Sequence, residues 1–213
     1  LNKENFADHL GIEITPECVS FSRDALGLKI STSIEAVNLP MISIATFWHS
    51  LEHLPINILR SVLTAIASHS SDKTRIIISV PNAGSPLYHF FGSNYAFFDP
   101  SSHLHQFTAA SLKILLKQHK FELQKSFFSF AYSFFGYLQT LINCGNVYHN
   151  FLYYFLKRGN CFGLKTPKVS LILLYNLALS AIFTPIALIG AAYDAIIKEK
   201  GAVLTLCFQI QKP

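Results

Sequence analysis

The stretch "TRIIISVPN", from Thr74 to Asn82, carries the strongest strand signal of the sequence. Its centre is a run of three isoleucines followed by Ser79 and Val80. A short and almost continuous apolar run is typical of a strand that is covered on both faces. Such strands lie between layers of helices, so the stretch predicts a domain with an α/β core.

The residues before this strand predict a second strand and a helix. "MISIATFW", residues 41–48, is another apolar run, and we expect this strand also to be covered on both faces. After Pro55 the apolar residues recur at the spacing of an amphipathic helix. They are Ile58, Leu59, Val62, Leu63 and Ile66. A strand, a helix and a strand in this order indicate a parallel pair joined by a crossover helix.

Shorter elements further upstream continue the alternation. Residues 9–14 and 28–31 predict two short strands. Between them a helix is expected to begin at Pro16, with Thr15 as its cap and Gly27 as its stop signal.

The residues after "TRIIISVPN" predict a long loop and then one more helix and strand. Residues 81–107 are rich in proline, glycine, serine and aromatic residues, and a loop of that length is typical of a lid or a binding loop. Thr108 is placed to cap a helix that ends near His119, and "KFELQKSFF", residues 120–128, predicts a strand. The whole pattern indicates a doubly wound, mostly parallel α/β sheet.

The last third of the sequence is apolar and aromatic. Val169 to Tyr193 is a run of 25 residues without a charge, which is long enough to cross a bilayer. Asn176, Ser180 and Pro185 interrupt the run, so a buried or interfacial helical hairpin is the alternative. After Gly201 the sequence predicts a final strand.

Composition limits the classes of partner. The chain is 51% hydrophobic and 14% charged, and its net charge of +5 is scattered without a block of lysine or arginine. This pattern argues against a nucleic-acid-binding protein and favours contact with anionic lipid. The four cysteines lack any C-x-x-C spacing, which predicts buried thiols in a reducing compartment and therefore a cytoplasmic location. The uncharged run from Val169 to Tyr193 leaves membrane association open.

A histidine cluster follows the strand 41–48. His49, Glu52 and His53 form the pattern H-x-x-E-H, which is also the signature of one class of zinc peptidases. That site needs a sustained helix, whereas Pro55 and the preceding strand leave barely one turn for these residues. The peptidase interpretation is therefore rejected.

The position of the cluster indicates another kind of site. In open parallel sheets, ligands bind beyond the carboxyl ends of the strands, and His49, Glu52 and His53 directly follow such an end. The alternative is that the three residues cap the strand and face solvent. The sequence alone leaves both open.

Several segments together resemble class I S-adenosylmethionine-dependent methyltransferases, of the bacterial methyltransferase-domain family. They are "GIEITPECVSFSRDALGL", "ATFWHSLEHLP", "IIISVPNAGSP" and "FFDPSSHLHQFTAASLKILLKQHKFEL". The resemblance covers residues 1 to about 128 in the family's order, and residues 202–213 are similar to its last strand. It implies a Rossmann-like methyltransferase sheet and S-adenosylmethionine as the cofactor.

The resemblance assigns the residues that bind the cofactor. Glu13, beside Ile14 at the end of the first predicted strand, matches the acid that accepts hydrogen bonds from the ribose hydroxyls. Phe47, Trp48 and His49 match the segment that lines the methionine end. An aromatic ring there would contact the sulfonium cation through its π face.

The resemblance also suggests a metal site and the bases. In related ubiquinone-type and RNA 2′-O-methyltransferases, the position of "HSLEH" reads Glu-x-x-Glu-His and binds a divalent metal, so Glu52 and His53 are the expected ligands. His49 replaces the first glutamate, which favours Zn, Mn or Fe over Mg. His49, His103 and His105 are the expected catalytic residues, and His103 and His105 are candidate general bases.

The sequence departs from the family at its start. The glycine-rich turn that follows the family's first strand is absent, so we expect a fragment whose sheet lacks that strand. Residues 1–128 then form a partial methyltransferase domain and residues 129–200 a hydrophobic helical insertion, a lid or membrane contact. Residues 201–213 supply the final strand.

These expectations favour one function and leave an alternative. The first is transfer of a methyl group to an oxygen or nitrogen of a sugar, lipid-linked or small aromatic acceptor, with membrane contact through residues 169–193. The alternative is a non-catalytic, membrane-associated interaction module on a degenerate methyltransferase fold.

Overall fold

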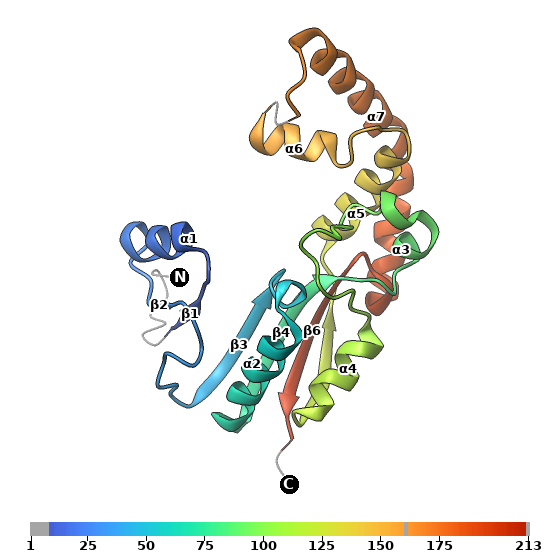
Figure 1. The fold of residues 1–213 in the computed structure, drawn as a ribbon. Coiled ribbons are helices and arrows are strands. Elements are labelled where there is room, and N and C mark those ends of the chain that lie inside the picture. Colours follow the sequence, from blue (N-terminus) through green and yellow to red (C-terminus); the bar gives the residue numbers. More distant parts are fainter. Residues whose placement is uncertain (1–8, 160–161, 212–213) are drawn as a thin grey trace.

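The computed structural model describes residues 9–159 and 162–211, and its centre is a four-stranded sheet with the order β3-β4-β6-β5 (Figure 1). The strands that form this sheet are β3 (Ile42–Trp48), β4 (Ser70–Pro81), β5 (Phe121–Phe127) and β6 (Val203–Ile210). The predicted final strand is therefore present, and it occupies the interior of the sheet between β4 and β5.

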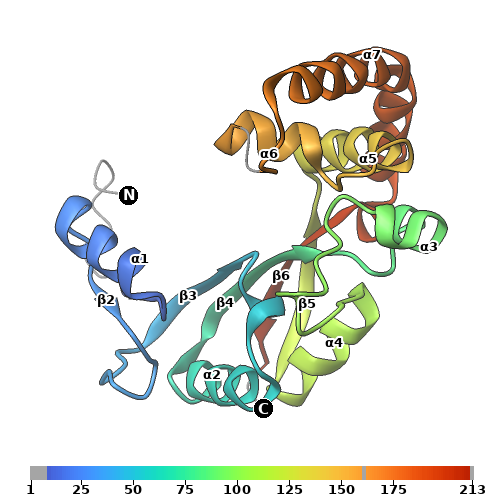
Figure 2. The same ribbon diagram turned by 45° about the horizontal axis from the view of Figure 1, so that its top comes forward.

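The sheet is small and mixed: three of its strands run in one direction, as predicted, and β6 runs against them. β3 and β4 are parallel, but β6 is antiparallel to both β4 and β5. The cause is the segment between β5 and β6, which leaves one end of the sheet and returns to the same end (Figures 1 and 2). A strand that starts where its predecessor stopped must run in the opposite direction.

The two shortest strands form a sheet of their own. β1 (Gly11–Ile12) pairs in parallel with β2 (Ile30–Ser31), and neither pairs with β3 in the described part of the chain. Helix α1 (Pro16–Ser20) and the π-helical turn η1 (Phe21–Ala25) connect them. In the part of the chain that the structure describes, this unit therefore does not extend the larger sheet.

Two helices cover one face of the larger sheet. Helices α2 (Ile56–Ser68) and α4 (Ala109–Gln118) lie on the same side of the strands (Figures 1 and 2), so these two do not form the two helical layers of a doubly wound fold. Thr108 caps α4 as predicted, and its side chain accepts a hydrogen bond from the N–H of Ser111. The core between helices and sheet contains Leu59, Leu63, Ile76, Ile78, Leu112, Leu116, Leu206 and Phe208. Each such side chain contributes about 1.5–3 kcal/mol when fully buried.

Strand β3 is not covered on both faces, contrary to prediction. Ile44 and Trp48 are 58% and 54% exposed, whereas Ala45 and Phe47 pack against the core. β3 is an edge strand of its sheet, with β4 on one side only. An apolar run in the sequence does not reveal this edge position.

The segment 81–107 contains more regular structure than the predicted loop. Helix α3 (Pro86–Phe91) begins at the N-cap Ser85, whose hydroxyl accepts a hydrogen bond from the N–H of Tyr88. The 3-10 turn η3 (Gly92–Asn94) follows. Pro86 at the first helical position was the available signal, but six residues are too few to show helical periodicity.

The apolar last third forms a helical unit between β5 and β6. It consists of α5 (Phe130–Cys144), α6 (Phe151–Arg158), α7 (Thr166–Ile196) and the 3-10 turn η4 (Lys198–Lys200). α5 and α7 pack side by side, and the first turns of α7 form the end of the unit that is farthest from the sheet in Figure 1. Figure 2 shows α6 beside α5 and α7. By length and composition, α7 could cross a membrane.

The expectation of buried thiols holds only in part. Cys207 in β6 is buried, but Cys18 on α1 and Cys144 at the end of α5 are exposed, and all three are free. The two exposed cysteines lie on helix surfaces that no other element covers, which spacing in the sequence cannot show. Cys161 lies outside the described residues, as do residues 1–8 and 212–213 of the predicted domains.

Candidate functional site

The site begins at the carboxyl end of β3, which lies next to the carboxyl end of β4 because the two strands are parallel. The N–H of His49 donates a hydrogen bond to the carbonyl of Ser79, at 2.8 Å, which ties the two strand ends together. His49 has φ of 48°, a left-handed conformation that is uncommon for residues other than glycine. The chain therefore turns sharply at His49 and enters the 3-10 turn η2 (Leu51–His53).

Glu52 is buried by its neighbours in this turn. Leu51 is fully buried in the core and holds the turn against the sheet. The carbonyl of Glu52 accepts hydrogen bonds from the N–H groups of Leu104 and His105, at 2.9 and 3.2 Å. The carboxylate is 1% exposed, and neither of its oxygens has a hydrogen-bond partner among the described residues. This burial excludes the alternative of a solvent-facing cap for Glu52.

His53 and His103 lie beside the Glu52 carboxylate. The ligand atoms of the three side chains lie within 4.8 Å of one another. The Nδ1–H of His53 donates to the carbonyl of Ser102, at 2.9 Å, if that nitrogen carries the proton. This tautomer leaves the lone pair of Nε2 free, as in many metal-binding histidines.

His49 forms the inner wall of the cluster. Its Nδ1 lies 3.6 Å from Oε1 of Glu52, too far for a hydrogen bond but close enough for an ion pair when the imidazole is protonated. Its ring is flanked by Phe97 and Tyr132, with centroid distances of 6.4 and 5.1 Å. Its Nε2 is buried without a hydrogen-bond partner in the described part of the chain.

Burial controls the charge of His103. Desolvation lowers the pKa of its imidazole, and the negative charge of Glu52 opposes this effect. Nearby, hydrogen bonds from Ser101 and Ser102 lower the pKa of the Asp99 carboxyl, which stays ionised and orders the loop that carries His103. A neutral imidazole can accept a proton or bind a metal.

The donor set of the cluster fits a divalent cation. A buried carboxylate with two unpartnered oxygens is unfavourable unless a cation or a donor compensates it. One carboxylate and two imidazoles are ligands that suit Zn, Mn or Fe. The structure thus adds His103 to the predicted ligands Glu52 and His53. The sequence did not suggest that His103 belongs to the same metal site.

The residues predicted to bind the cofactor are not all brought together. Phe47 packs against the core and Trp48 is exposed beside the histidine cluster. Glu13 and Ile14 belong to the separate β1–β2 unit, where Oε1 of Glu13 accepts the N–H of Thr15 at 2.8 Å. This hydrogen bond lowers the pKa of Glu13 and keeps the carboxylate ionised, and hydrogen bonding from the Thr15 side chain and the N–H of Ile14 acts in the same direction.

His105, a predicted general base, is held by structural hydrogen bonds instead. Its Nε2 donates to the carbonyl of Leu54, at 2.9 Å, and its ring contacts Phe107. Together with its N–H bond to Glu52, this contact holds the turn η2 in place.

Sequence reasoning missed Phe97 and Tyr132 as walls of the site. Both lie in stretches crowded with aromatic residues, and nothing in the pattern distinguishes them from their neighbours. Tyr132 belongs to α5, so the helical unit contributes directly to the site.

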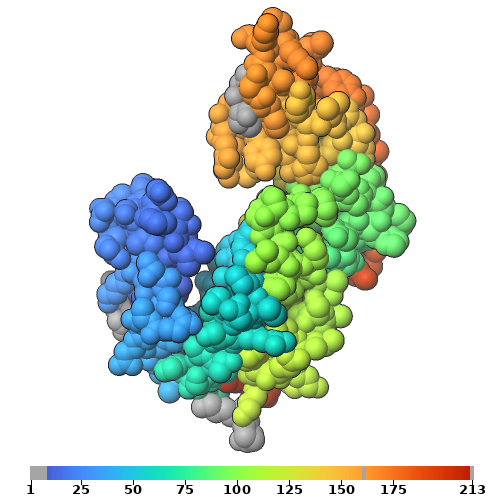
Figure 3. Space-filling view, viewed as in Figure 1, coloured from blue at the N-terminus to red at the C-terminus, as the bar shows by residue number. Residues whose placement is uncertain are grey.

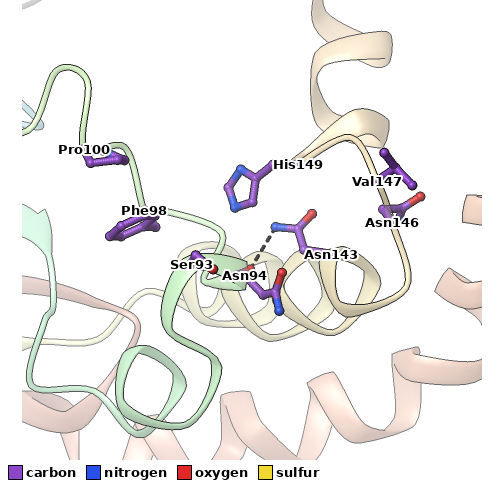
Figure 4. A pocket seen from close by; sticks show the side chains of 8 residues that line it. All are labelled: Ser93, Asn94, Phe98, Pro100, Asn143, Asn146, Val147 and His149. Atoms are coloured by element: carbon purple, nitrogen blue, oxygen red, sulfur yellow. Dashed lines mark hydrogen bonds between the residues drawn. The ribbon is translucent and has the colours of Figure 1, made fainter.

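A separate hollow of about 410 Å³ lies between α5 and the segment 93–100 (Figure 4). Asn143 donates to the carbonyl of Asn94 there, at 2.9 Å, and Nε2 of His149 lies 3.2 Å from the carbonyl of Tyr95. Burial lowers the pKa of His149. The residues that line this hollow do not include any of the histidine cluster.

Comparison with known proteins identifies a family. A family described as "Methyltransferase domain" matches residues 3–126, which is more than half of the 213 residues. No curated protein matches the sequence.

Comparison with solved structures supports the fold. The structure is similar to that of the [4+2]-cyclase SpnF, with a TM-score of 0.52 and 10% identity over 96% of this chain and 66% of the cyclase. An S-adenosylmethionine-dependent methyltransferase from Clostridium acetobutylicum matches with a TM-score of 0.42 and 10% identity, over 56% of this chain and 66% of that one. Coclaurine N-methyltransferase matches with a TM-score of 0.44 and 11% identity, over 94% of this chain and 60% of that one. The chain thus spans at most about two thirds of these proteins.

Proposed function

The chain belongs to the methyltransferase-domain family, and we propose that it transfers a methyl group from S-adenosylmethionine to an oxygen or nitrogen of a small or lipid-linked acceptor, in the cytoplasm. The observation that carries the proposal is the cluster of the buried Glu52 with His53 and His103 at the carboxyl ends of β3 and β4. Ligands of open α/β sheets bind at such ends.

Glu13, Trp48 and His49 are the residues of this chain that would contact the cofactor. The ionised carboxylate of Glu13 is suited to accept ribose hydroxyl donors, and the exposed ring of Trp48 offers a π face to a sulfonium. S-adenosylmethionine supplies an electrophilic methyl group on sulfur. In the transfer, the acceptor's oxygen or nitrogen forms the new bond to carbon, the carbon–sulfur bond breaks, and the acceptor loses a proton.

We assign His49 as the general base that removes the acceptor's proton. Its unpartnered Nε2 accepts the proton from the acceptor, and the Glu52 carboxylate, 3.6 Å from Nδ1, stabilises the imidazolium that results. Phe97 and Tyr132 flank the ring and leave the His49 side chain 29% exposed. Most of the acceleration then comes from alignment of acceptor and sulfonium.

Glu52, His53 and His103 are the residues that would hold a divalent metal. A cation there would lower the pKa of an acceptor hydroxyl. The carbonyl of Ser102 would keep His53 in the binding tautomer.

Titration of S-adenosylhomocysteine into the protein tests the cofactor assignment. We expect binding heat with the wild type and about 10- to 100-fold weaker binding for Glu13→Ala, because hydrogen bonds to a charged group contribute about 1.5–3 kcal/mol. Glu17→Ala, which removes an exposed acid on α1, is the control and should bind as the wild type does. No heat with the wild type would refute the proposal.

Metal analysis of the purified protein tests the second assignment. We expect Zn, Mn or Fe in the wild type and at least 10- to 100-fold weaker binding in Glu52→Gln, since loss of even an outer-sphere partner has this effect. Glu122→Gln, at an exposed position of β5, should retain the metal.

The fold of Glu52→Gln is checked by its thermal unfolding. Removing an unpaired buried charge should leave its melting temperature in the absence of metal unchanged or higher. A wild type without bound metal, or a Glu52→Gln protein that binds equally well, would exclude the metal site.

A further inference from the structure

Helix α7 exposes an apolar surface that no part of the described chain covers. In its most apolar window of 18 residues, only 11% of the residues are buried, which is far too few for the core helix of a soluble domain. The exposed side chains lie along the whole helix. The most exposed are Leu171, Leu174, Ile182, Ile189 and Ile196, between 64% and 82%.

On the opposite face of α7, the polar side chains have hydrogen-bond partners within the protein. Asn176 is fully buried and exchanges two hydrogen bonds with Asn146, at 3.0 and 3.1 Å. The hydroxyls of Ser180 and Thr184 donate to carbonyls of their own helix. These polar groups of α7 therefore have partners inside the protein, and the side chains exposed on the other face are mostly apolar.

The charges around this surface have one sign. Residues 123–193 contain no aspartate or glutamate. Four basic residues lie in the last turn of α6 and at the start of α7: Lys157, Arg158, Lys165 and Lys168. In Figure 3 the orange part of the chain, where α6 ends and α7 begins, forms the top of the helical unit that projects from the sheet. We name these four residues the basic tip.

The basic tip also carries tyrosines in the arrangement found at membrane interfaces. Lys157 lies 5.4 Å from the ring centre of Tyr153, and Lys168 lies 5.9 Å from that of Tyr148. Tyrosine rings and long basic side chains both place an apolar body in the hydrocarbon and a polar end in the headgroups.

We infer that α6 and α7 dock this protein on a bilayer with anionic headgroups, in the plane of the interface. The uncharged exposed face of α7 enters the acyl region, and the basic tip binds the headgroup phosphates. A second copy of the chain fits less well, because its residues 123–193 offer no acidic side chain to pair with the basic tip. The inference does not depend on methyl transfer.

A spanning orientation of α7 is disfavoured by the same charges. Crossing the bilayer would carry the basic tip to the side opposite the α/β domain. Basic residues near membrane segments remain on the cytoplasmic side, where we place the domain. The tip therefore stays on the near side, and the helix lies along the surface.

Vesicle co-sedimentation tests the headgroup contact. We expect the wild-type protein to sediment with vesicles of phosphatidylcholine and phosphatidylglycerol, more weakly with phosphatidylcholine alone, and less as salt rises. The double variant Lys165→Glu and Lys168→Glu should bind anionic vesicles about tenfold less or weaker still. It should fold normally, because acidic residues stabilise the first turn of a helix.

Matched controls separate the surface from general charge and hydrophobicity. Lys73→Glu with Lys117→Glu makes the same charge change on β4 and α4 and should bind as the wild type does. Ile182→Gln should weaken binding, whereas Ile114→Gln should not, although both isoleucines are 64% exposed.

Three results would overturn the inference. They are a wild-type protein that ignores anionic vesicles, an equal loss of binding in test and control variants, and a protein that high salt with alkaline carbonate fails to release. The last result would show a spanning helix.

Discussion

Asp194 is the one acidic side chain of α7, and it connects this helix to the sheet. Its carboxylate accepts hydrogen bonds from the N–H of Ala202, at 3.1 Å, and from the hydroxyl of Tyr137, at 3.2 Å. It is fully buried. Desolvation raises the pKa of the carboxyl above its usual range, against the effect of its hydrogen bonds.

The raised pKa predicts a pH dependence of stability. The folded protein binds this proton more tightly than the unfolded chain, so the contribution is complete at low pH and is lost as pH rises through the folded pKa. In urea denaturation, Asp194→Asn should therefore lose less free energy of unfolding than the wild type as pH rises from acid to neutral. Asp72→Asn, at an exposed site, should follow the wild type. Parallel curves for Asp194→Asn and the wild type would contradict the assignment.

Individual site residues were predictable in type but not in environment. The position of Glu52 and His53 after a strand was readable from the sequence, and the structure places both in one cluster. The burial of Glu52 was not readable, because it depends on Leu51 and on the distant N–H groups of Leu104 and His105. Acidic residues are mostly exposed, so the sequence favours the opposite result.

At the scale of elements, the contact between α5 and α7 depends on glycine. A methyl group at Gly190 would lie 2.5 Å from ring atoms of Tyr137, and the hydroxyl of Tyr137 is bonded to Asp194. The ring therefore has little freedom to move. The two helices can approach this closely only because residue 190 has no side chain.

This close approach reverses the usual effect of replacing a helical glycine. Gly190→Ala should lower the free energy of unfolding by about 1–3 kcal/mol, as overpacking does, although alanine favours a helix by about 1 kcal/mol. Equilibrium unfolding in urea measures the change. In a Tyr137→Ala background the same substitution should be neutral or stabilising. A stabilising Gly190→Ala in the wild type would show that the helices do not pack as described.

Most elements were predictable because their signals are local. Thr108 and Pro16 mark the starts of α4 and α1, and Gly27, with φ of 63°, marks the end of the first helical segment. The exposed faces of β3 were not predictable, since an edge position depends on which strands pair with it. Short helices such as α3 are not predicted, because about one and a half turns are too few to show the helical period of apolar residues.

At the scale of the whole molecule, the order of the strands was the part that the sequence concealed. Alternating strands and helices favour parallel pairing, and β3 with β4 follows that rule. The long helical unit before β6 breaks it by returning the chain to the edge where β5 ended. No local signal of β6 itself distinguishes the two directions.

The central position of β6 has a consequence for folding during translation. Ser79 of β4 and Thr205 of β6 are hydrogen-bonded partners that lie 126 positions apart. Until residues 203–210 emerge from the exit tunnel, β4 and β5 have no strand to join them, and the core face of β4 remains uncovered by β6. The sheet therefore completes its folding only after residue 210 has been translated, and its apolar surfaces stay exposed until then.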